Sequence, residues 1–261
     1  MDWLIHLPVW VQALLATFFT YLMTALGASF VFLSKRLNRK VLNSMQGVAA
    51  GIMIAASFFS LLLPAKERLE TEGRGVAVVA LVLSLGFALG GVFIVLSNFF
   101  MSRSKAFSEE KTRGGALTFF AMTLHNIPEG FAVGVAFGTL TGEYSAWIAA
   151  VMLAVGIGIQ NFPEGLCVAV PLRGQGMSAG KAFFFGQFSG LVEIAAGVLG
   201  AVAVGFVSGI LPWALSFSAG AMIAVSCSEL IPSCVIEGKA SSVFGVTFGF
   251  DLMMLRDVLL G

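Results

Sequence analysis

Long apolar stretches, separated only by short polar breaks, most constrain what this chain can fold into. Of its 261 residues, 58% are hydrophobic and 11% are charged, whereas soluble domains carry about 25% charged residues. A helix that crosses a bilayer needs about 20 predominantly apolar residues, and the polar breaks leave eight such stretches. We predict an all-α polytopic membrane protein that forms one transmembrane domain over residues 1–261. The predicted spans are 8–34, 45–64, 75–100, 114–139, 143–171, 179–207, 211–235 and 240–260.

The positions of Lys and Arg predict how these spans are oriented. Eleven of the 15 basic residues lie in, or within three residues of, the connections that follow the first, third, fifth and seventh spans. Cytoplasmic connections carry the excess of Lys and Arg in membrane proteins. We therefore expect these four connections to face the cytoplasm and both termini to lie outside. No basic stripe favours a nucleic-acid partner, and lipid is the expected surrounding.

Two near-copies of one hexapeptide lie inside the fourth and fifth predicted spans. Residues 125–130 read His-Asn-Ile-Pro-Glu-Gly, and residues 160–165 read Gln-Asn-Phe-Pro-Glu-Gly. A carboxylate inside a bilayer costs roughly 2.5 to 3.5 kcal/mol on insertion scales, so it usually faces a partner or a pathway. In each copy the first residue and the glutamate are four apart, which places them on one helix face. The turn between the two spans is short, so the four side chains can converge.

The types of side chain in the hexapeptides indicate which cation they could hold. Imidazole, carboxylate and amide oxygen suit first-row divalent metals such as zinc, iron(II) or manganese(II), with cadmium as a mimic. A shell of oxygen alone would indicate calcium or magnesium. The alternative is a polar lock between helices, in which His125 bonds Glu164 or Gln160. Two motif copies, together with Glu193 and Glu229 in later spans, favour metal ligation. Because protons compete for the same groups, we expect transport to fall at low pH.

These motifs resemble those of the ZIP (Zrt/Irt-like) family of divalent metal transporters, in particular its bacterial GufA-like branch. The two hexapeptides carry the resemblance, and residues 51–65, Glu193 and residues 228–232 add weaker support. The resemblance extends over essentially the whole chain. It implies inverted three-helix repeats that flank a central helix pair holding a binuclear metal centre. It also implies transport toward the cytoplasm, an elevator-like motion of the metal-bearing helices and a homodimer.

The resemblance also implies which residues bind the metal. Met53, which spacing alone indicates as a packing residue, becomes a soft fifth ligand of the first site. A second site shares Glu164 as a bridge, and Asn161 gives it less charge than the carboxylate of some relatives. The first site comprises Met53, His125, Glu129, Gln160 and Glu164; the second comprises Asn126, Asn161, Glu164 and Glu193; and Glu229 is a possible release-side ligand.

We therefore expect a transporter rather than an enzyme, located in the plasma (inner) membrane. Zinc is the first candidate substrate, with iron, manganese and cadmium next, and no separate cofactor is expected. One alternative is an intramembrane metallohydrolase, although the chain lacks its His-Glu-x-x-His arrangement. The other alternative is a metal-gated or proton-conducting channel lined by the same glutamates. An ATP-driven pump is disfavoured because residues 174–181 have the wrong glycine spacing for a phosphate loop.

Overall fold

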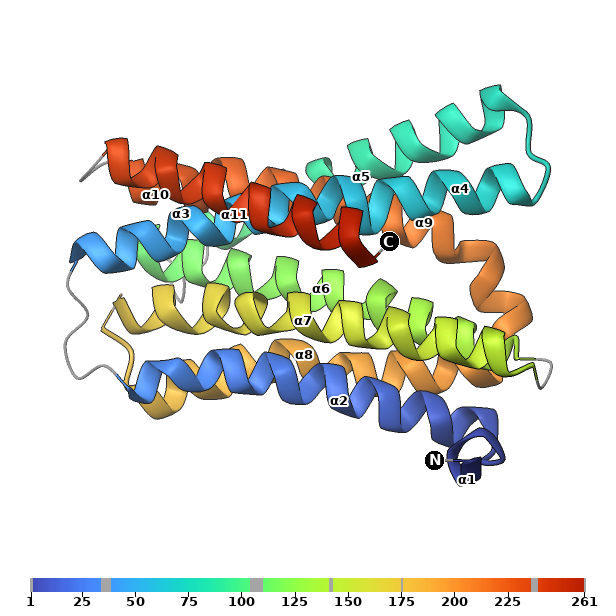
Figure 1. Ribbon diagram of the computed structural model, residues 1–261. Coiled ribbons are helices and arrows are strands. Elements are labelled where there is room, and N and C mark those ends of the chain that lie inside the picture. Colours follow the sequence, from blue (N-terminus) through green and yellow to red (C-terminus); the bar gives the residue numbers. More distant parts are fainter. Residues whose placement is uncertain are drawn as a thin grey trace.

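The chain folds into a bundle of long helices in the computed structural model (Figure 1). The structure describes residues 2–33, 39–103, 110–140, 143–174, 176–235 and 239–260, and these residues contain helices and no strand. The all-α prediction is confirmed for this part of the chain. The helices are α1 (Asp2–Ile5), α2 (Val9–Ser29), η1 (Phe30–Phe32), α3 (Arg39–Ala56), η2 (Ser57–Leu62), α4 (Leu63–Thr71), α5 (Val76–Ser102), α6 (Glu110–Gly138), α7 (Tyr144–Gly174), α8 (Ala179–Val202), α9 (Val204–Val225), η4 (Ser226–Leu230), α10 (Ile231–Val235) and α11 (Lys239–Leu260).

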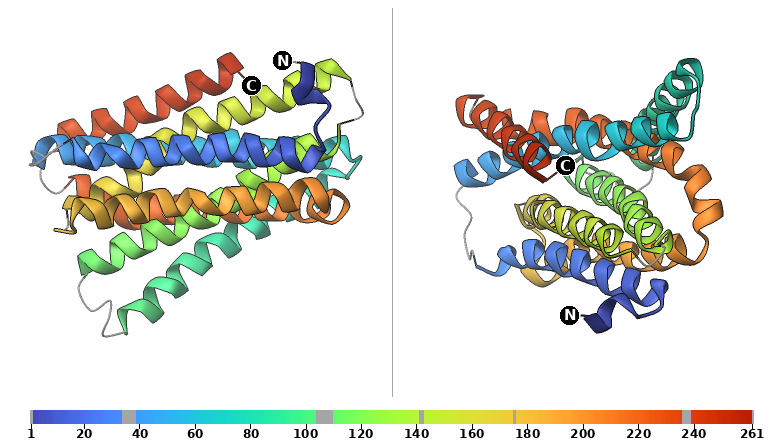
Figure 2. Two further views of the ribbon diagram at one scale, coloured as in Figure 1. Left: turned by 90° about the horizontal axis from the view of Figure 1, so that it is seen from below. Right: turned by 45° about the vertical axis from the view of Figure 1, so that its right-hand side comes forward.

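The two hexapeptide-bearing helices, α6 and α7, form the middle layer of the bundle (Figures 1 and 2). On one side they pack against α2 and α8, and on the other against α3 and α9. Two further close pairs, α3 with α11 and α5 with α9, complete the second side. The motifs therefore lie where protein surrounds them, and lipid contact is left to the outer helices.

Six helical segments among the described residues are long and apolar enough to cross a membrane. They are Val9–Phe32, Gln46–Thr71, Val76–Ser102, Tyr144–Gly174, Ala179–Val202 and Gly209–Leu230. The predicted span 114–139 does form a helix, α6, but its hexapeptide lowers the hydropathy of that segment. In the predicted span 240–260, the apolar part Ala240–Leu255 is shorter than the other six. The count of eight spans stays a prediction.

The second predicted span continues beyond Pro64, where the sequence indicated its end. The chain passes from α3 into the π-helix η2 and then into α4, with Pro64 in the first turn of α4. The seventh span follows the same course, because η4 is also a π-helix and Pro232 lies in the first turn of α10. Proline has no N–H to donate to the preceding turn of a continuous helix, and here each proline follows directly on a π-helical turn. A change of helix type therefore accommodates each proline without ending the helix.

The sixth and seventh predicted spans meet earlier than expected. The break lies at Ala203, between α8 and α9, and Ala203 has φ −107° and ψ 36°. The sequence placed this boundary at 208–210 because no polar residue marks it. An apolar alanine in a non-helical conformation gives no signal in composition.

Two helix pairs are built on the same backbone contacts. In the α3–α11 pair and the α5–α9 pair, a glycine on each helix lies so close to a carbonyl of the other that a Cβ would collide with it. Small residues at such positions let helices in membranes approach closely. The contacts are Gly51 to Val246, Gly249 to Val48, Gly220 to Phe87 and Gly90 to Phe217.

The sequences around two of these glycines are also alike. Residues 51–57 and 220–226 share Gly, Met, Ile, Ala and Ser at identical spacing. In both stretches the serine begins a π-helix. α3 and α9 therefore correspond to each other in three ways: in sequence, in the π-helix that follows each of them, and in the close glycine contacts that each makes with one partner helix, α11 or α5.

Candidate metal centre

The first and fifth residues of both hexapeptides are buried where α6 and α7 face each other. His125 is 0% exposed and Glu164 is 1% exposed. Both helices run continuously through their prolines, Pro128 and Pro163. The four-residue spacing on each helix is therefore kept, and Glu129 and Gln160 are buried as well.

His125 brings the two motif glutamates together. Its Nε2 atom lies 3.2 Å from Glu129 Oε1 and 3.2 Å from Glu164 Oε1. One ligand atom from each of these three residues can be chosen so that all lie within 4.8 Å of one another. Two carboxylates and an imidazole nitrogen at this spacing are typical of a divalent metal site.

Gln160 adjoins this cluster through its amide nitrogen. Nε2 donates a hydrogen bond to Glu129 Oε1 and lies 3.5 Å from His125 Nε2. Its Oε1 accepts a hydrogen bond of 3.0 Å from Ser60 Oγ in η2. The amide oxygen, which would be the ligand atom, therefore points to the serine in this conformation.

A second group of polar side chains lies between α2, α7 and α8. Asn161 Nδ2 donates to both carboxylate oxygens of Glu193 at 2.8 Å, and Thr20 Oγ1 donates to Glu193 Oε2 at 2.5 Å. Asn126 Nδ2 donates to the backbone carbonyl of Ser189 at 2.7 Å. All five residues are buried, and three of them, Asn126, Asn161 and Glu193, belong to the predicted second ligand set.

Five buried atoms around the two motifs have no hydrogen-bond partner among the described residues. Buried polar groups are almost always paired, and an unpaired one costs about 1–3 kcal/mol. Four of the five are oxygens, whose lone pairs a cation could satisfy. The atoms are His125 Nδ1, Asn126 Oδ1, Glu129 Oε2, Asn161 Oδ1 and Glu164 Oε2.

The centre is also rich in acidic groups. Glu129, Glu164 and Glu193 are each at most 3% exposed. Within the described ranges, no Lys or Arg forms an ion pair with any of the three. Buried charges are normally paired or bound to metal, so a divalent cation would supply the missing positive charge.

A family profile described as "ZIP Zinc transporter" matches residues 101–257, which include both hexapeptides, Glu193 and Glu229. The chain belongs to the ZIP family. Zinc transporter ZIP11 of Homo sapiens is 36% identical, covering 96% of this chain and 97% of that protein. Zinc transporter GufA of Myxococcus xanthus is 36% identical over 91% of this chain and 94% of its own length. Zinc transporter ZIPB of Bordetella bronchiseptica is 36% identical over 91% of this chain and 78% of its own length.

The remaining predicted residues of this ZIP protein lie outside the two motif helices. Met53 on α3 is fully buried, in the same apolar cluster as Met122, which precedes His125 by three residues. Glu229 lies in the π-helix η4 and is half-buried. Met53 therefore lies in the interior, and Glu229 lies at a helix irregularity of the kind often found at functional sites.

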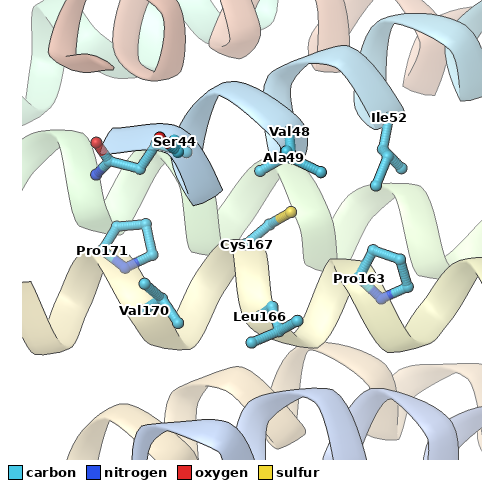
Figure 3. Close-up of a pocket in the computed structure, with 10 residues that line it drawn as sticks. Ser44, Val48, Ala49, Ile52, Pro163, Leu166, Cys167, Val170 and Pro171 are labelled. Atoms are coloured by element: carbon cyan, nitrogen blue, oxygen red, sulfur yellow. The ribbon is translucent and has the colours of Figure 1, made fainter. Parts of the chain in front are cut away.

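A cavity of about 350 Å³ separates α3 from α7 in this ZIP protein (Figure 3). Pro163 of the second hexapeptide and Ile52 lie at one end, and Pro171 and Ser44 lie at the other. Cys167 lines the wall between them. The cavity thus runs along α7 from Pro163 of the second hexapeptide toward the C-terminal end of that helix.

Two residues that contact the centre are not predicted by the sequence reasoning. Ser60 has no signal in the sequence, because it lies in the π-helix η2, whose spacing differs from that of a regular α-helix, and there it reaches Gln160. Thr20 does have a signal in the sequence. Thr17, Thr20 and Thr24 recur at helical spacing in an apolar stretch, and all three are buried.

Proposed function

We propose that this protein carries divalent transition-metal ions, zinc foremost, across the membrane toward the cytoplasm. The observation that carries the proposal is the buried cluster in which His125 Nε2 lies 3.2 Å from one carboxylate oxygen of both Glu129 and Glu164. The zinc transporters similar to this chain over most of its length support zinc as the substrate.

The ligand set supports a site that binds zinc and releases it. Zinc accepts imidazole and carboxylate ligands, and tight structural zinc sites are usually rich in thiolates. The first site is proposed as His125, Glu129 and Glu164, with the Gln160 oxygen and the Met53 thioether completing it. Cadmium would bind in the same place, because a thioether favours softer ions.

A second ion is proposed beside the first, bounded by Asn126, Asn161, Glu164 and Glu193. The partnerless oxygens of both asparagines and of Glu164 support this position. Asn161 supplies no charge, so we expect the second ion to bind more weakly than the first.

The direction of transport is inferred from the cavity and the basic residues. The C-terminal ends of α2, α5, α7 and α10 lie at one end of the bundle (left in Figure 1). The connections that follow these helices, together with the helix ends that flank them, contain 11 of the 15 Lys and Arg residues. By the positive-inside rule that end faces the cytoplasm, and the cavity leads toward it. We propose the cavity as the release path, Glu229 as a residue that receives the ion, and both termini outside.

The proposed architecture is one domain of eight spans with inverted three-helix repeats around α6 and α7. The matching glycine contacts of α3–α11 and α5–α9 support the repeat. The asparagines of the two hexapeptides add support, because each donates to a backbone carbonyl of a flanking helix, Thr20 on α2 or Ser189 on α8. On the family resemblance we also propose that the protein is a homodimer and that it lies in the plasma membrane, which in a bacterium is the inner membrane.

Uptake of radiolabelled zinc into proteoliposomes tests the function. Saturable uptake that is lost in both Glu164→Ala and His125→Ala is the expected result. If both variants transport zinc at the unaltered rate, the site is wrong. Flux that stays linear with zinc concentration would favour a channel, and substrate hydrolysis without transport would favour a metallohydrolase.

A further inference from the structure

Asn161 is held by its amide nitrogen, while its carbonyl oxygen has no partner. Nδ2 lies 2.8 Å from both oxygens of Glu193 and 3.3 Å from the backbone carbonyl of Thr20. A carboxylate accepts hydrogen bonds and cannot donate them, so Glu193 decides which end of the amide faces it. Oδ1 is turned away from Glu193 and is buried without a hydrogen bond in the described part of the chain.

Asn126 is held in the corresponding way from the other hexapeptide. Its Nδ2 donates to the backbone carbonyl of Ser189 at 2.7 Å, and its Oδ1 is likewise buried without a partner among the residues described. Anchoring the nitrogen and leaving the oxygen with free lone pairs is thus a feature of both motifs. Only Asn161 has a carboxylate as its anchor.

Glu193 is itself fixed by Thr20. Thr20 Oγ1 donates to Glu193 Oε2 at 2.5 Å, and both residues are 0% exposed. This hydrogen bond links α2 to the side chain of Glu193 on α8. Both carboxylate oxygens of Glu193 therefore already accept hydrogen bonds from the protein.

We propose that Thr20 and Glu193 are positioning residues for the second ion, and that they act through Asn161. Thr20 holds Glu193, Glu193 holds Asn161 Nδ2, and Asn161 Oδ1 is left to contact the ion. This proposal rests on the proposed metal transport. In it Glu193 positions Asn161, whereas the family resemblance implies that Glu193 binds the second ion directly. An aspartate at position 161 could not take this arrangement, since it has no N–H to donate and would repel Glu193.

The first test removes one hydroxyl group from α2. Thr20→Val keeps the shape of the side chain, and Thr20→Ser keeps the hydroxyl. Thr17→Val is the matched control, because Thr17 is equally buried and its hydroxyl donates within its own helix, to Ala13 O at 2.8 Å. Thr20 Oγ1 likewise lies 3.0 Å from Thr17 O of its own helix, so the contact with Glu193 is what distinguishes the two threonines. Loss of a residue that orients a ligand lowers metal affinity 10- to 100-fold. We expect Thr20→Val to raise the KM for zinc uptake about tenfold, and Thr20→Ser and Thr17→Val to match the parent.

The second test separates an anchor from a ligand. Glu193→Gln retains an oxygen that can accept from Asn161, whereas Glu193→Leu retains none. We expect Glu193→Gln to keep the zinc dissociation constant of the purified protein within about threefold, and Glu193→Leu to raise it about tenfold. Adding Thr20→Val to Asn161→Ala should not raise the zinc dissociation constant further, because both changes remove the same oxygen contact.

Each outcome decides the proposal. It is overturned if Thr20→Val behaves like Thr17→Val, if Glu193→Gln is as damaging as Glu193→Leu, or if Thr20→Val and Asn161→Ala act independently. Gel filtration and thermal unfolding identify any variant that fails to fold. If Thr20→Val fails to fold, the comparison of Glu193→Gln with Glu193→Leu decides the proposal. His125→Ala separates the two proposals, because uptake that survives this change refutes the transport site whatever Thr20 does.

Discussion

His125 on α6 lies 3.2 Å from Glu164 on α7, joining the two motif helices through one nitrogen and one carboxylate oxygen. A polar lock between helices would be complete with such a contact. Here it is not complete, because Glu164 Oε2 and His125 Nδ1 still have no partner among the described residues. The contact therefore leaves capacity for an ion, which the lock hypothesis does not explain.

Removing either member of this pair is expected to abolish zinc uptake. Glu164→Gln keeps the size of the side chain and removes its charge, so we expect uptake to fall by about 100-fold or more, beyond the loss of a residue that merely orients a ligand. Initial rates of zinc uptake in proteoliposomes provide the measurement. Glu70→Gln serves as the control, because Glu70 pairs with Lys66 on an exposed face of α4. If Glu70→Gln lost as much zinc uptake as Glu164→Gln, the loss could not be assigned to the metal site.

Met53 should tune the choice of metal. A thioether binds cadmium better than manganese, so Met53→Leu is expected to lower the ratio of cadmium to manganese uptake several-fold. The control is Met122→Leu, since Met122 is equally buried in the same cluster. An unchanged ratio in Met53→Leu would assign Met53 to packing.

Filling the cavity between α3 and α7 should block transport without removing the ion. Val170 lines the cavity, and Val170→Trp would place an indole in its 350 Å³. We expect uptake to fall at least tenfold while zinc binding to the purified protein stays within about twofold, because the motif side chains are untouched. Val78→Trp on the exposed face of α5 is the control. Normal uptake by Val170→Trp would exclude this release path.

The close contact of α7 with α2 should be sensitive to a single methyl group. A Cβ at Gly165 would collide with the carbonyl oxygen of Thr24. Overpacking costs typically 1–3 kcal/mol, so Gly165→Ala should lower the midpoint of thermal unfolding in detergent by several degrees. A methyl group at Gly180 on α8 would meet no neighbouring helix within 4 Å, and Gly180→Ala should leave that midpoint unchanged or raise it slightly. Equal effects of the two changes would contradict the packing argument.

The sequence predicted the parts of this fold that depend on periodicity and charge. The spacing of His125 and Glu129 needs only a continuous helix, and the short turn before α7 brings Glu164 to the same place. The contacts of Ser60 and Thr20 were not predicted, because one depends on a π-helix and the other on which face of α2 meets α8. The boundary at Ala203 was missed because backbone conformation, and no polar residue, marks it.

The glycine contacts divide the bundle into groups of helices that are bound backbone to backbone. The glycine contacts between helices that the structure describes, such as those of Gly27, Gly51, Gly90 and Gly130, join members of the set α2, α6, α7 and α8, or join α3 to α11 or α5 to α9. None of these contacts connects the first set to the rest, and the cavity lies on that boundary. Close backbone contacts resist sliding, whereas side chains can repack. A small apolar compound wedged into this boundary would therefore inhibit transport without competing for the metal.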